Sequence, residues 1–82
     1  MTILDDARRE IAEKSRAEIE EETAWKWAAR AVATYQGFGG SLFDAAHYYE
    51  EAIEHAALAD HSGELLRGVR EWVHQYVPRG AI

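Results

Sequence analysis

The chain has 82 residues, enough for one small domain and too few to enclose a large active-site cavity. Its 15 acidic residues against 9 lysines and arginines give a net charge of -6, which argues against direct nucleic-acid binding. The absence of cysteine excludes disulfides and thiolate metal sites. No apolar run is long enough to cross a membrane and the N-terminus is acidic, so we expect a cytoplasmic protein without membrane contact.

The first predicted element is a long helix over about residues 3–36. Thr2 and Asp5 have the spacing of a capping box at its start, and Gly37 begins a glycine-rich turn at its end. A strongly charged segment interrupts the apolar stripe in the N-terminal half of this helix. At about 1.5 Å per residue this helix would be about 50 Å long, roughly twice the length of the helices predicted after it. We therefore expect its N-terminal half to overhang them and to be largely solvated.

Two shorter helices are predicted after the turn, over about residues 42–59 and 64–77. Ser41 and Asp44 have the spacing of a second capping box, and Pro78 prevents the last helix from continuing. The long stretches between these signals are rich in good helix formers. Both helices therefore complete an all-helical chain.

Helical periodicity indicates how these helices pack. It places Leu42 and Ile53 on the core side of the second helix and gives the third helix a broad apolar stripe. The predicted fold class is all-α. We expect residues 1–82 to form a single helical domain, a helical hairpin with a third helix, assembled as an oligomeric bundle.

A homo-oligomer is predicted from the first helix. Trp27 lies about 160° around that helix from Trp25, at 100° per residue, so the two rings cannot share one intramolecular core. A large aromatic residue on a second face is typical of an interface. The predicted interface residues are Trp27, Ile11, Ile19 and Tyr48.

A cluster of histidines and glutamates on the second helix is a candidate metal site. His47, Glu51 and His55 are spaced one helical turn apart, and Glu54 lies on the same side. Imidazoles and carboxylates at this spacing suit iron or zinc between facing helices. Glu22 is the expected contribution of the first helix, with Glu18 and Glu21 as alternatives. The competing interpretation is an ordinary solvated surface, because so many acidic residues place some neighbours by chance.

Residues 47–58, HYYEEAIEHAAL, resemble the second-helix signature of ferritin-like proteins, most nearly of the encapsulated-ferritin type. The resemblance covers about a third of the chain. It implies short hairpin subunits that assemble a diiron site only across a subunit interface. It also implies that a glutamate on the first helix joins a Glu-x-x-His on the second, and Glu21 and Glu22 stand about where that glutamate would be.

This chain departs from that pattern at one position. Ala52 stands three residues before His55, where the resemblance implies a glutamate. Glu51 or Glu54 would have to substitute, from a different direction around the helix.

No catalytic constellation emerges from the remaining residues. The glycine-rich turn lacks the lysine and hydroxyl of a phosphate-binding loop, and Ser41 and Ser62 stand at cap positions. Glu71 and His74 have the Glu-x-x-His spacing, but Glu71 also lies one turn from Arg67 in an ordinary surface pair. We expect a binding protein rather than an enzyme.

Two functions follow from these patterns. The first is an acidic interaction and oligomerisation module without a cofactor, which binds a second copy of itself, a larger protein, or both. In this role it would dock as an inhibitor or adaptor on a basic surface, since opposite charge speeds such encounters. The alternative is a ferritin-like subunit for metal storage or oxidation, with iron or zinc bound across a subunit interface.

Overall fold

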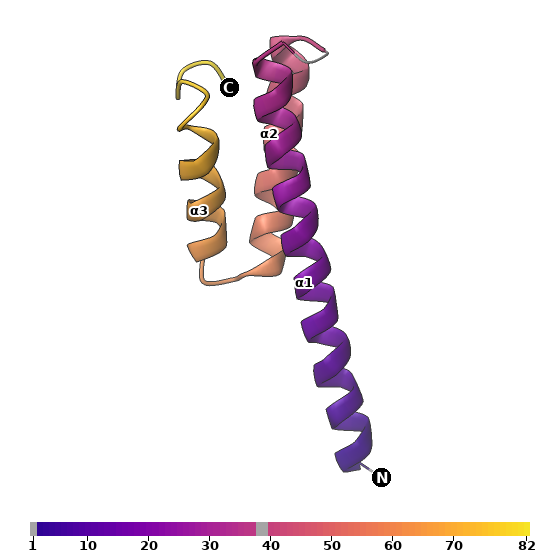
Figure 1. Cartoon of the computed structure of the whole chain (residues 1–82). Helices are drawn as coiled ribbons and strands as arrows, with labels where there is room; N and C mark the ends of the chain where they lie inside the picture. Colours follow the sequence, from indigo (N-terminus) through magenta and orange to yellow (C-terminus); the bar gives the residue numbers. More distant parts are fainter. Residues whose placement is uncertain (1, 38–39) are drawn as a thin grey trace.

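The structure, a computed structural model, describes residues 2–37 and 40–82, with side chains from residue 16 onward. Its regular elements are three α-helices: α1 (Thr2–Tyr35), α2 (Leu42–Ala59) and α3 (Glu64–Val73) (Figure 1). The predicted all-α class is confirmed. α1 and α2 form an antiparallel hairpin, α3 runs antiparallel beside α2, and α1 extends well past the loop between α2 and α3 (Figure 1).

None of the described helices combines the length and the apolar character needed to cross a membrane.

The turn between α1 and α2 depends on glycine at one position above all. Gly40 has a φ of +94°, and a Cβ atom there would lie 3.0 Å from both Asp44 Oδ2 and Thr34 Cγ2. Both the backbone conformation and the available space therefore require glycine. The predicted capping box begins at the next residue and is confirmed. The Ser41 amide donates to Asp44 Oδ2 at 2.9 Å, and the Asp44 amide donates to Ser41 Oγ at 3.2 Å.

Asp60 organises the loop between α2 and α3. Its carboxylate accepts hydrogen bonds from the Ser62 hydroxyl at 2.7 Å, the Ser62 amide at 2.9 Å and the Leu65 amide at 3.1 Å. These bonds, that of the Ser62 hydroxyl foremost, hold the pKa of the Asp60 carboxyl below its usual range. Asp60 therefore caps the start of α3 from the preceding loop, next to Gly63 in a left-handed conformation.

α3 ends at Val73, earlier than the predicted boundary. Residues 74–77 continue as turns, in which the two amides after His74 bond three residues back instead of four. The His74 ring also takes part, since its Nδ1 atom lies 2.9 Å from the Val77 carbonyl oxygen and donates to it. Val77 is buried, so these turns are fixed by packing.

Alanines predominate in the contact between α1 and α2. Three on α1 and three on α2 have no exposed surface, and their small side chains let the two helices approach closely. The largest fully buried side chains are valines of α3 and the segment after it. The buried alanines are Ala24, Ala28, Ala31, Ala45, Ala52 and Ala56, and the valines are Val69, Val73 and Val77.

The predicted core side of α2 is confirmed in part, since Ile53 packs against the core cluster. Leu42 is 52% exposed and Ile53 is half-buried toward α3, whereas Ala52 and Ala56 are fully buried against α1. A periodicity argument follows the largest apolar residues, but close helix packing here selects the smallest ones.

Enlarging one buried alanine should destabilise the hairpin. We expect Ala52→Leu to lower the free energy of unfolding by about 1–3 kcal/mol through overpacking. Ala57→Leu, an exposed position on the same helix, should change it by less than about 0.5 kcal/mol. Urea denaturation measures both variants, and equal effects would contradict the close contact between α1 and α2.

Candidate functional site

The hairpin of α1 and α2 has two faces with different surroundings. α3 covers one of them, where Trp25 packs edge-on against Trp72 with ring centroids 5.9 Å apart. No described helix covers the opposite face (Figure 1). We call it the open face. The side chains that lie on the open face belong to Arg16, Glu20, Trp27 and Arg30 of α1 and to Tyr48, Glu51, His55 and Leu58 of α2.

An aromatic pair lies near the turn end of the open face. The Trp27 and Tyr48 rings stack with centroids 5.5 Å apart and planes at 28°. The Arg30 guanidinium lies 4.5 Å from the Tyr48 centroid and 5.7 Å from that of Trp27, within cation–π range. The structure thus brings two predicted interface residues together. Trp25 and Trp27 lie on opposite faces of the hairpin, but both rings pack against the same core cluster, so the prediction that they cannot share one intramolecular core is wrong.

A carboxylate–imidazole cluster follows along the same face. His55 Nδ1 of α2 hydrogen-bonds Glu20 of α1, and His55 Nε2 lies 3.7 Å from Glu51 Oε2. The three side chains are 25–30% exposed, so they are partly shielded from water and open on one side. The structure thus brings Glu51 and His55 together on the open face, where the His55 ring also meets Glu20 of α1.

The geometry of the His55 ring limits what this cluster can do. Its two nitrogens point in different directions, so one ion cannot bind both. If Nδ1 carries the proton and donates to Glu20, the Nε2 lone pair is available beside Glu51. Glu20 would then orient the ring, and Glu51 and Nε2 would be the two donors offered to a metal. Among the described residues, no group of three or more histidines and carboxylates is arranged to hold a metal ion.

The other predicted metal ligands lie elsewhere on the surface. Glu22 forms an exposed ion pair with Lys26 on the next turn of α1, at 3.6 Å. His47 is exposed beside the Tyr48 ring, with centroids 5.9 Å apart. Glu54 is exposed along the groove between α2 and α3. A single chain therefore assembles only part of the predicted ligand set.

The remaining predicted interface residues are both aliphatic. Ile19 is 60% exposed on α1, consistent with a surface that a partner could cover. The side chain of Ile11 lies outside the part of the chain that the structure describes.

Glu20 is the site residue that the sequence analysis missed, because neighbouring glutamates were selected for their place in the interrupted stripe. The antiparallel pairing of the two predicted helices is the signal that identifies Glu20. Glu20 and His55 are symmetric in the sequence about a point just after Gly37, and Trp27 and Tyr48 are symmetric about the same point. Pairing residues symmetrically about that turn would have put Glu20 opposite His55.

Ala52 occupies the position where the ferritin-like resemblance implies a glutamate. It is fully buried in the core cluster, between the close-packed helices. A glutamate side chain there would enter the contact with α1 rather than approach His55.

His74 serves the fold. Its Nε2 atom accepts a hydrogen bond from the Tyr49 hydroxyl at 3.2 Å, while Nδ1 donates to the Val77 carbonyl. Both ring nitrogens are therefore used, and Glu71 is exposed beside Arg67 and Arg79. The Glu-x-x-His spacing in α3 does not form a ligand pair.

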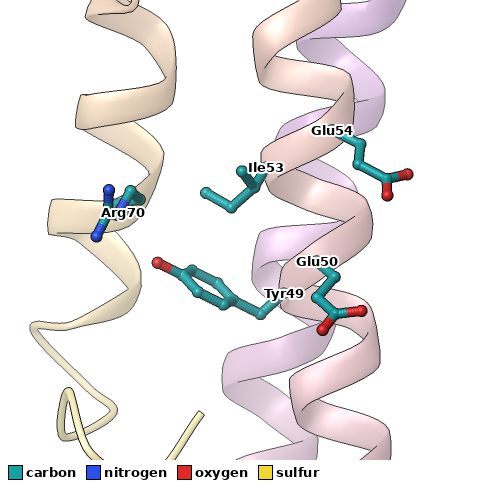
Figure 2. Close-up of a pocket in the computed structure, with 5 residues that line it drawn as sticks. All are labelled: Tyr49, Glu50, Ile53, Glu54 and Arg70. Atoms are coloured by element: carbon teal, nitrogen blue, oxygen red, sulfur yellow. The ribbon is translucent and has the colours of Figure 1, made fainter.

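A groove of about 370 Å³ lies between α2 and α3, on the covered side of the hairpin. Tyr49 and Ile53 point from α2 toward α3, whereas Glu50 and Glu54 project outward from α2 (Figure 2). Arg70 of α3 lines the other side of the groove. The groove thus has an apolar floor and charged margins.

Comparison of the chain with protein-family models, with curated proteins and with solved structures finds no match. The ferritin-like resemblance remains a prediction from residues 47–58.

The pair formed by Glu20 and His55 should contribute to stability. We expect Glu20→Gln and His55→Gln each to destabilise the fold, and a double-mutant cycle to give a coupling of about 1 kcal/mol for this partly shielded hydrogen bond. Glu21→Gln, an exposed neighbour, should show no coupling to His55→Gln. Thermal and urea unfolding measure the cycle, and zero coupling for Glu20 would contradict the described contact.

Proposed function

We propose that this protein is a self-associating interaction module, whose open face binds the open face of a second copy. The observation that supports this most directly is the position of Trp27, Tyr48 and Leu58 on a face that no described helix covers. Aromatic and aliphatic side chains gathered in this way are typical of interfaces.

Leu58 is the most exposed aliphatic residue of this face. It is 62% exposed and borders a hollow of about 320 Å³ with Arg16, Ala17 and His61. Covering one such side chain contributes roughly 1.5–3 kcal/mol. The hollow therefore gives a partner both apolar area and a recess to fill.

The unequal helix lengths also support self-association. α1 has 34 residues and α2 has 18, which correspond to lengths of about 51 and 27 Å. The molecule is accordingly elongated, at 54 × 22 × 14 Å. In an antiparallel pair, the part of α1 that extends past α2 would find a surface on the second copy.

The charges of the open face suit a two-fold arrangement. The open face carries both signs of charge, with Arg30 at the Tyr48 ring, Arg16 at the hollow beside Leu58, and the carboxylates of Glu20 and Glu51 at His55. A two-fold axis presents each patch to its own copy, so both signs must occur within the patch for attraction to result. This mixture offsets the net charge of -6, which alone would keep two copies apart.

A charge placed on the open face should weaken the pair. We expect Leu58→Arg to raise the dissociation constant at least about tenfold, because it buries a charge where a leucine was covered. Leu42→Glu is the matched control at the other end of α2, on the side of α3. Each substitution places a charge where the helix dipole favours it, so neither should unfold the helix. Sedimentation velocity over a concentration series measures both.

The proposal fails if the parent protein stays monomeric at every concentration. It also fails if Leu58→Arg and Leu42→Glu weaken association equally, since that would place the interface off the open face.

A second candidate function rests on the cluster of Glu20, Glu51 and His55. If His55 Nε2 and Glu51 from two copies faced each other across the proposed interface, they would supply two imidazoles and two carboxylates. That donor set suits iron or zinc. Under this alternative the protein is a ferritin-like subunit whose metal site exists only in the assembled state.

Metal should then stabilise the assembly. We expect zinc or ferrous iron to raise both the melting temperature and the oligomer fraction, because an ion that binds only the pair shifts the equilibrium toward it. His55→Ala should abolish both responses. His47→Ala removes an exposed histidine of the same helix and should leave them unchanged. A metal response that survives in His55→Ala would contradict the site, and native mass spectrometry gives the metal count.

A further inference from the structure

The groove between α2 and α3 lies on the covered side of the hairpin, away from the proposed self-association face. Its floor is formed by Tyr49 and Ile53, which point toward α3 (Figure 2). The Tyr49 hydroxyl hydrogen-bonds His74 Nε2 at 3.2 Å, and its ring lies 5.4 Å from that of His74. The aromatic part of the floor is thus held in place before any partner arrives.

The carboxylates at the margin of this groove form no ion pair with any of the described residues. α2 contains four carboxylates and no lysine or arginine. Asp44 closes the capping box and Glu51 lies beside His55. Glu50 and Glu54 are the other two, and within the described part of the chain neither forms an ion pair.

Glu50 and Glu54 lie one helical turn apart and are both exposed. Like charges at this spacing destabilise a helix by a few tenths of a kcal/mol. Positive charge supplied by a partner would turn this repulsion into attraction. The chain therefore carries a paired negative charge directly beside an apolar floor.

We propose that this groove binds a basic amphipathic helix of a partner protein. One or two apolar side chains of that helix would cover Tyr49 and Ile53, while its lysines or arginines would pair with Glu50 and Glu54. The groove volume of about 370 Å³ is at the lower end of the range of ligand sites, about 300–1,000 Å³, which suits a few side chains rather than a whole ligand. Amphipathic helices that dock in grooves place their apolar anchors at positions i, i+3, i+4 and i+7.

Arg70 gives the site its direction. It lines the groove from α3, so it would repel the basic side of the partner helix and favour an acidic or polar side. A partner with lysines on one flank and a glutamate on the other should therefore fit in a single orientation. This inference is independent of self-association, because the groove and the open face are on different sides of the hairpin.

The probe is a fluorescein-labelled synthetic helix of leucine and lysine, with leucines at i, i+3, i+4 and i+7 and lysines on one flank. Anisotropy titration should show binding that weakens with salt. The double variant Glu50→Gln/Glu54→Gln should raise its dissociation constant at least about tenfold. The matched control Glu21→Gln/Glu64→Gln removes the same charge from exposed positions elsewhere and should change it less than about twofold.

Three results would overturn the proposal. The first is equal weakening by both double variants, which would mean attraction to net charge alone. The second is equal binding of a scrambled peptide of the same composition, which has no apolar face. The third is a changed oligomer mass in Glu50→Gln/Glu54→Gln, which would mean that a second copy occupies the groove. Leu58→Arg should bind the peptide like the parent. The peptide titration can therefore be interpreted even if the protein does not self-associate.

Discussion

The close approach of α1 and α2 is the constraint on which the rest of the structure depends. Because the helices meet through alanines such as Ala28 and Ala52, there is no room between them for a large side chain. The aromatic rings with described contacts in the hairpin therefore lie beside this contact and not within it. Trp25 and Tyr49 lie toward α3, whereas Trp27 stacks on the other side. These rings pack against the same small core from different sides.

This division gives the two faces different chemistry. On one, α3 adds buried valines and leaves a shallow groove that Glu50 and Glu54 border. On the other, apolar and charged groups of both signs alternate, from the ring of Trp27 to the cluster around His55. A surface with both signs suits a second copy, and a margin of one sign suits a partner of opposite charge. The same narrow hairpin can therefore serve two contacts.

The sequence predicts the positions of the helices better than it predicts which side of each helix packs against its neighbours. Capping at Ser41 and the glycine-rich turn mark the hairpin because their chemistry is local. The core side of α2 was predicted only in part: Ile53 packs against the core, but alanine gives a weak hydrophobic signal and only packing reveals the role of Ala52. α3 ends early for a similar reason, because its end depends on the His74 ring bonding a carbonyl. The partner of His55 is equally non-local, since it follows from the antiparallel register alone.

The central claim is that the open face, and not the side of α3, meets a second copy. Fluorine NMR of protein labelled with 5-fluorotryptophan tests it directly, because the three tryptophans report on both faces. The resonance of Trp27, assigned with Trp27→Phe, should move on dilution while those of Trp25 and Trp72 stay fixed. A Trp27 resonance that does not change with concentration, while the other two do, would contradict the claim.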